Sequence, residues 1–536
     1  MSSQSTTQKE FGKWRSILWP VHNFELKKLL PLFLMFFFIS FNFTILRDTK
    51  DALIVTAQGS GAETIPFLKL WGVLPMAIIF MLIYAKLSNK LSKTALFYSM
   101  VAPFLIFFVL FSTVLYPARD VLHPTVFADK LQEILPQGFM GFIAIFRNWT
   151  FSLFYILSEL WGSVVLSLLF WSFANDIMKV TEAKRFYSLL GLGANLALLI
   201  SGPLIVLSSD IRSKVPAGVD PWGVSLKMLT ALVLFSGVLI IGLYYWINKH
   251  VLTDDRFYSK DQQKVQKKAK PKMSMKESFA FLARSKYLGL LAVLVIGYGV
   301  AINIVEVTWK GQLKLQYPHS NDYVSFMGKF SFCTGLFSSF MMLFVGGNVV
   351  RRLGWRFAAA TTPIMLFITG ALFFSFVIFK EQLGGFIALF GMTPLMLTVI
   401  IGATQNILSK STKYSLFDPT KEMAYIPLDP ESKFKGKAAI DVVGARLGKS
   451  GGALMQQGLI IVFGSLALIT PYLAAILLGM IVIWLFAVKN LSKRFKVKIA
   501  EHNKETAAAE AAKAETVKNE TVSKENGQLE AETIRR

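Results

Sequence analysis

The sequence predicts an all-α integral membrane protein with about twelve transmembrane helices in two six-helix halves, a major-facilitator-like arrangement. Of its 536 residues, 54% are hydrophobic, 14% are aromatic and only 17% are charged. A soluble protein would carry about 25% charged residues. The apolar residues gather in runs long enough to cross a bilayer as helices, and no series of alternating ten-residue segments predicts a β-barrel.

Twelve apolar runs are predicted to span the membrane: 29–47, 66–86, 94–116, 150–175, 186–208, 225–247, 287–309, 324–348, 354–379, 384–408, 448–467 and 469–488. We therefore divide the chain into five parts. A cytoplasmic N-terminus (1–28), without a removable signal peptide, precedes the N-terminal bundle (29–247). A basic cytoplasmic linker (248–286) leads to the C-terminal bundle (287–488). The charged tail (489–536) is predicted to be disordered or a solvated helix.

Charge sets the predicted topology. The chain has 57 Lys and Arg against 33 Asp and Glu, a formal charge of +24. These positive residues are concentrated in the N-terminus, the linker, the tail and the short turns after the second and eighth spans, so both termini are predicted to face the cytoplasm. This distribution explains the charge without a nucleic-acid partner. One cysteine and five scattered histidines favour neither a disulfide nor a metal site, and no cofactor is predicted.

Two weak internal matches favour a duplicated six-helix unit. The turns YAKLSNKLSKTAL and GGNVVRRLGWR occupy equivalent places in the two halves, and the second resembles the major facilitator loop without its Asp. Ala197-Leu198 and Gly202 match Ala453-Leu454 and Gly458 at one constant offset. In a duplicated transporter the substrate site is expected between the halves, near the bilayer midplane.

Charged residues inside spans are costly and are candidates for function. In the first span, Arg47, Lys50 and Asp51 share a helix face, so Arg47 and Asp51 are expected to neutralise each other and leave Lys50 spare. Glu159, within the fourth span, must be protonated or paired with a cation on another helix. Both features could equally be structural ion pairs.

Further charges lie on the seventh and eleventh spans. Glu306 precedes Lys310 by one helical turn, which favours a local pair. Lys69 and Lys329 are expected to extend to the membrane surface. Asp441, Arg446 and Lys449 precede a Ser-Gly-Gly turn and an apolar helix, and a helix N-terminus suits phosphate. Its Gly-Lys-Ser lacks the spacing and the preceding strand of a Walker A motif.

Positive residues therefore outnumber Glu159 and Glu306 at the predicted cavity, which favours a polyanionic substrate. Lysine and arginine bind phosphate through charge-assisted hydrogen bonds. Aromatic residues near the cavity could stack a base; the candidates are Phe41, Phe43, Trp161 and Trp309. From the residues alone, the chain is interpreted as a carrier for an organic phosphate.

Several motifs resemble those of the ATP:ADP antiporters of plastids and obligate intracellular bacteria, with the chlamydial type most similar. They are RDTKD, VTAQGSGAETIPFLK, SELWGSV, VEVTWK, TKEMAYIPLD and KGKAAIDVVGARLGKSGG. The resemblance, over about residues 10–490, implies twelve helices and exchange of external ATP for internal ADP, with phosphate as a candidate co-substrate. It places charges important for transport at Lys50, Glu159, Glu306 and Lys449, whereas plastid relatives need not carry a basic residue at Arg446.

The predicted function is secondary active antiport of ATP and ADP without hydrolysis, by a monomer in the inner membrane of an intracellular bacterium. Lys50, Lys449, Arg446 and Lys310 are the predicted phosphate ligands, and Glu159, Glu306 and Asp441 the predicted charge partners. The alternative is an importer or exchanger of other nucleotides, with or without proton coupling. A membrane enzyme is disfavoured because no nucleophile constellation lies at a span end. A channel is disfavoured because paired halves with buried charges suit alternating access.

Overall fold

The computed structural model describes residues 21–178, 180–211, 214–253, 277, 284–385, 391–429, 432, 436–437, 439–440 and 445–535. At some of these positions, Arg446 and Lys449 among them, it describes the backbone only. Asp441 and most of the linker 248–286 lie outside the described residues. Within the described part of the chain, all long regular elements are helices.

The N-terminal half contains α2 to α12. Its long helices are α2 (Leu26–Val55), α4 (Leu74–Ser88), α5 (Lys93–Leu110), α9 (Trp149–Leu160), α11 (Val180–Ser209) and α12 (Pro221–His250). Shorter elements are η1 (Asn23–Glu25), α3 (Thr64–Phe67), η2 (Leu68–Val73), η3 (Phe111–Leu115), α6 (Arg119–Leu122), α7 (Thr125–Ile134), η4 (Gln137–Phe139), α8 (Met140–Arg147), η5 (Trp161–Phe170) and α10 (Trp171–Ile177).

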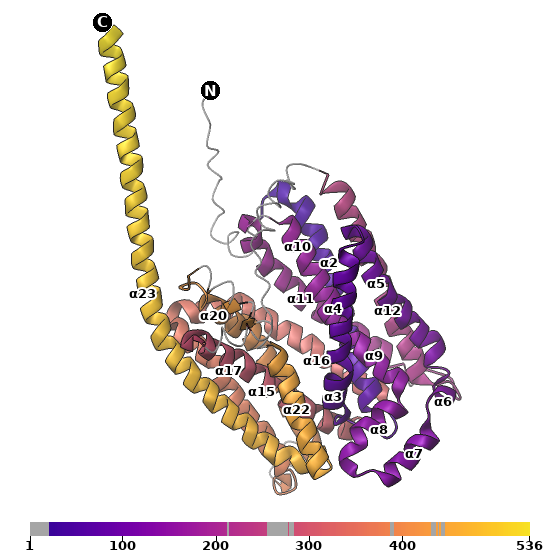
Figure 1. The fold of residues 1–536 in the computed structure, drawn as a ribbon. Coiled ribbons are helices and arrows are strands. Elements are labelled where there is room, and N and C mark those ends of the chain that lie inside the picture. Colours follow the sequence, from indigo (N-terminus) through magenta and orange to yellow (C-terminus); the bar gives the residue numbers. More distant parts are fainter. Residues whose placement is uncertain are drawn as a thin grey trace.

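The C-terminal half contains α15 to α23. Its elements are α15 (Lys286–Gln316), α16 (Ser320–Phe340), η6 (Met341–Gly346), α17 (Gly347–Ile378), α19 (Pro394–Thr412), η7 (Lys413–Phe417), α20 (Asp418–Met423), α22 (Ala445–Phe463) and α23 (Leu466–Arg535). The helix α23 continues through the charged tail and extends well beyond the bundle (Figure 1).

The predicted helical membrane fold is confirmed. Nine helices of the described residues are long and apolar enough to cross a membrane. One of them, Ser320–Ile378, covers the eighth predicted span and all but the last residue of the ninth, with a non-helical break at Gly354. Each of the twelve predicted runs overlaps a helix; the tenth falls on α19 and the eleventh on α22.

The two halves lie side by side (Figure 1) and meet most closely where α11 of the first half crosses α16 of the second. Glycine permits this approach. A Cβ on Gly202 would lie 2.6 Å from the carbonyl oxygen of Gly328, and a Cβ on Gly335 would lie 2.8 Å from that of Asn195. Small residues of this kind let helix backbones pack closely in membranes.

Hydrogen bonds also join the halves at the end of the bundle where α2 ends and α16 begins, here called the α2 C-terminal end. Thr56 and Ser320 share a hydrogen bond of 2.7 Å, and the amide of Asn321 donates to the Ser209 carbonyl at 2.9 Å. Lys314 donates to the Ser60 carbonyl. The halves are therefore in direct contact at this end.

Candidate functional site

The last turns of α2 carry four charged residues into the centre of the bundle, Arg47, Asp48, Lys50 and Asp51. Asp48 and Asp51 are completely buried, and Lys50 is nearly so. Arg47 pairs with Asp48, its neighbour, at 2.9 Å and not with Asp51. The Arg47 guanidinium also donates to the Ser331 hydroxyl of α16 at 2.7 Å, and that hydroxyl donates to Asp48 at 2.6 Å. The predicted Arg47–Asp51 pair is therefore wrong.

Lys50 has carboxylate partners, whereas the sequence predicted that it would be left without one. Its ammonium lies 2.8 Å from Asp51 Oδ1 and 3.0 Å from Glu159 Oε1, and 3.9 Å from the centre of the Tyr155 ring. Of the two alternatives left open for Glu159, protonation or a cation on another helix, the structure shows the cation. Because the partner belongs to α2 and Glu159 to α9, their spacing in the sequence could not identify the pair.

Lys310 makes the equivalent contacts from the other half. Its ammonium lies 3.0 Å from Glu306 Oε1, one turn earlier on α15, and 2.8 Å from Asp51 Oδ2. The local pair is thus confirmed, but Lys310 is buried and does not reach the membrane surface. The five side chains form an alternating line across both halves, Glu159–Lys50–Asp51–Lys310–Glu306, which we call the charge chain.

Two further lysines flank the charge chain. Lys69, in η2, donates to the Asn303 side chain of α15 at 2.6 Å and interacts electrostatically with Glu306 and Lys310. Lys410, on α19, lies over the Phe330 ring at 4.9 Å and interacts electrostatically with Arg47 and Glu306.

Among the described residues, no carboxylate oxygen lies within 4.0 Å of the ammonium group of Lys69 or of that of Lys410. The prediction that Lys69 extends to the surface is wrong, whereas Lys329 is exposed.

Sequence reasoning missed Lys410 because the tenth span was predicted to end at residue 408, which left this lysine in a loop. It missed the role of Lys69 because a lysine near a span end usually extends to the interface. The structure, unlike the sequence, marks these positions: Lys69 lies within the π-helical segment η2, Glu159 shortly before the π-helical segment η5 and Lys410 shortly before η7. Such segments interrupt regular helices and occur frequently at functional sites.

The predicted phosphate ligands of the eleventh span are described less fully. Arg446 and Lys449 lie in the first turns of α22, which begins at Ala445. The helix continues through Ser450, Gly451 and Gly452, so the predicted Ser-Gly-Gly turn before the helix is wrong. This part of α22 packs closely on α15, because a Cβ on Gly448 would lie 3.0 Å from Gly299 Cα and one on Gly452 would lie 3.2 Å from Asn303 Cβ. The backbone of Lys449 is thus near the helix that carries Glu306 and Lys310.

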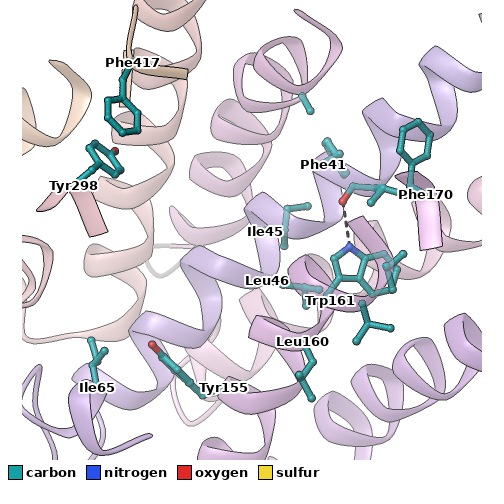
Figure 2. Close-up of a cluster of buried hydrophobic side chains, with 14 of the residues drawn as sticks. Phe41, Ile45, Leu46, Ile65, Tyr155, Leu160, Trp161, Phe170, Tyr298 and Phe417 are labelled. Carbon is teal, nitrogen blue, oxygen red and sulfur yellow. Dashed lines mark hydrogen bonds between the residues drawn. The ribbon is translucent and has the colours of Figure 1, made fainter. Parts of the chain in front are cut away.

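The aromatic residues considered for base stacking belong to the packed interior. The indole of Trp161 is fully buried and donates to the Ile39 carbonyl at 3.1 Å (Figure 2). The indole of Trp309 is also buried and donates to the Val399 carbonyl at 3.0 Å. These contacts anchor η5 to α2 and α15 to α19, so both rings serve the positioning of the site helices.

A separate cavity of about 190 Å³ lies at the α2 C-terminal end. Its lining includes Thr56, Arg119, His123 and Ser320. The Arg119 guanidinium is held by Asp220 at 3.1 Å. This cavity is distinct from the charge chain and has no uncompensated cation among its described lining residues.

Together, the charge chain, Arg47, Asp48, Lys69 and Lys410 contain five cations and four carboxylates, a formal excess of one positive charge. They come from α2, η2, α9, α15 and α19, hence from both halves. Buried charges with incomplete compensation, placed between two halves of a helical bundle, define a secondary transporter for an anion.

The comparisons with known proteins agree with this class. The model of the TLC ATP/ADP transporter family matches residues 4–495. The chain belongs to this family.

Relatives cover nearly the whole chain. ADP,ATP carrier protein 1 of Chlamydia pneumoniae is 64% identical over 503 residues, covering 94% of this chain and 98% of the relative. The chloroplastic ADP,ATP carrier protein 2 of Arabidopsis thaliana is 54% identical over 480 residues, covering 90% and 76%. Among solved structures, a bacterial homologue of the iron transporter ferroportin in an inward-facing state shares the fold, with a TM-score of 0.53, 13% identity, and coverage of 88% and 100%.

Proposed function

We propose that this protein exchanges external ATP for internal ADP across a bacterial inner membrane by alternating access, without hydrolysing either nucleotide. The observation that carries the proposal is the charge chain, which places Lys50 of one half and Lys310 of the other on a single buried carboxylate, Asp51. Family membership and the names of the relatives support ATP and ADP as the substrates.

In this proposal the phosphate chain is held between the halves. Lys50 and Lys310 bind phosphate oxygens when their glutamates release them, and Arg446 and Lys449 at the start of α22 add further positive charge. Lysine and arginine hydrogen bonds to phosphate are charge-assisted and therefore strong. Glu159 and Glu306 hold the two lysines when no nucleotide is bound. They suit this role because their side chains are 26% and 21% exposed, whereas the lysines are 2% exposed.

Labelled nucleotide uptake tests the exchange. Cells that express the protein should take up labelled ATP, and unlabelled ADP added afterwards should chase the label out. Unlabelled GTP, CTP and UTP added in the same way measure the base preference. Release of inorganic phosphate in step with uptake, or uptake that does not saturate, would contradict a carrier that binds and exchanges intact nucleotide.

We further propose that both termini and the linker 248–286 face the cytoplasm, since their lysine and arginine residues obey the positive-inside rule. The single native cysteine, Cys333, is exposed, so a Cys333→Ser protein provides a clean background for labelling. A cysteine at Val126, which is 70% exposed on α7, should react with a membrane-impermeant reagent in intact cells. A cysteine in the linker should react only after lysis; the reverse pattern would invert the topology.

A further inference from the structure

We infer that Asp51 makes the exchange obligatory: it locks the two halves together when no nucleotide is bound, and a nucleotide phosphate replaces it on Lys310 during transport. The inference rests on the proposed function and adds to it a residue that sequence analysis treated only as a neutraliser of Arg47. It depends on four features of the structure, which concern position, burial, accessibility and charge.

The first feature is the position of Asp51 between the halves. One carboxylate oxygen lies 2.8 Å from Lys50, on its own helix α2, and the other lies 2.8 Å from Lys310, on α15 of the opposite half. Because Lys50 moves with Asp51, the Asp51–Lys310 contact is the one of the two Asp51 ion pairs that is broken when the halves separate. This contact lies next to the hydrogen bonds that join the halves at the α2 C-terminal end, such as Thr56–Ser320 at 2.7 Å.

The second feature is burial. Asp51 is 0% exposed and Lys310 is 2% exposed, so neither charge is compensated by water in this arrangement. Separating a buried pair leaves an uncompensated charge on each side, which is strongly unfavourable. A carrier without nucleotide therefore has to break this pair before its α2 C-terminal end can open.

The third feature is the accessibility of the ends of the charge chain. Glu159 and Glu306 are 26% and 21% exposed, in contrast to Asp51. A phosphate group that approaches the chain reaches the lysines from the side of these glutamates. It can then satisfy Lys310 while Asp51 remains paired with Lys50, so that no lysine loses all of its partners.

The fourth feature is the source of attraction for the phosphate. Lys69 and Lys410 have no carboxylate of the described residues within 4.0 Å, and both interact electrostatically with Glu306 and Lys310. Their positive potential favours a polyanion beside the chain. Nucleotide binding thus supplies the charge that lets Lys310 leave Asp51, which couples opening to the presence of substrate.

The experiment uses purified full-length protein in liposomes preloaded with labelled ATP. Efflux is measured into buffer with ADP and into buffer without nucleotide. The wild-type protein should release label quickly only with external ADP. Asp51→Asn keeps the shape of the side chain but removes its charge, and it should raise efflux into nucleotide-free buffer at least tenfold per inserted protein. The ratio of the two effluxes should then fall towards one.

The matched control is Glu182→Gln. Glu182 forms a buried ion pair with Lys28 at 2.7 Å, but both residues belong to the N-terminal half. This variant removes a buried charge whose ion pair among the described residues lies within one half, so its efflux should still require external ADP.

The outcomes separate the two claims. Wild-type protein that does not exchange ATP for ADP at all contradicts the proposed function. Exchange by the wild type, together with an inserted Asp51→Asn protein that still requires external ADP or that neither exchanges nor leaks, overturns the role of Asp51. If Asp51→Asn does not insert, the same ratio is measured on Lys310→Gln, which removes the other end of the lock. A wild-type ratio in that variant overturns the inference as well.

Discussion

Lys410 offers a direct test of how the site attracts its anion, because its removal should affect binding and folding differently. Its ammonium has no carboxylate of the described residues within 4.0 Å, and Arg47 and Lys310 add like charge nearby. Replacing it by glutamine therefore leaves no carboxylate without its partner and relieves repulsion. We expect Lys410→Gln to fold with an unchanged or slightly higher melting temperature.

Nucleotide binding should weaken in the same variant. We expect Lys410 to donate a hydrogen bond to the bound phosphate chain, and a hydrogen bond from a charged group contributes about 1.5–3 kcal/mol. Since about 1.4 kcal/mol corresponds to a factor of ten, the Kd should rise by roughly ten- to a hundredfold. ATP should lose more affinity than ADP, because it carries about one additional negative charge near neutral pH and so gains more from a nearby cation.

The assay is equilibrium binding of labelled ATP and ADP to purified protein, with the melting temperature measured on the same samples. Lys410→Arg keeps the charge and should retain most of the affinity, and Lys329→Gln removes an exposed lysine of the neighbouring helix as a control. Wild-type Kd values for both nucleotides in Lys410→Gln, or a lower melting temperature with unchanged binding, would refute the reasoning.

Three other substitutions test the packing and the charges. Lys310→Ala should destabilise the protein by about 3–5 kcal/mol in chemical unfolding, because it leaves Asp51 with one partner fewer in a buried site; an effect below 1 kcal/mol would contradict this. Gly202→Ala should cost about 1–3 kcal/mol, since its Cβ would meet a backbone oxygen at 2.6 Å, whereas Gly242→Ala, with open space, should be neutral. Burial and, to a lesser extent, Arg119 lower the pKa of His123 below its usual 6.5. Because the unfolded chain then binds the proton more readily than the folded protein, acidification below that pH should reduce the melting temperature. His123→Asn should make the melting temperature less dependent on pH.

The sequence by itself determined where the membrane-spanning helices form and which charged residues lie within them. Runs of about 20 apolar residues are sufficient to predict spans, because the bilayer imposes their length. The pair Glu306–Lys310 was also predictable, since four residues bring two side chains to the same helix face. The cost of a buried charge limited Glu159 to two states, protonated or paired with a cation, and the structure shows the pair with Lys50.

Only the tertiary structure decided which helices supply the partners. Arg47 could reach Asp48 or Asp51 by local geometry, and it pairs with Asp48 because Ser331 of α16 completes that contact. Asp51 is then available to Lys50 and to Lys310 of the other half. A periodic pattern specifies neighbours along one helix, but the distance between two helices depends on how all of their side chains pack. The charge chain, and the location of Lys69 and Lys410 beside it, therefore could not be derived from the order of the residues.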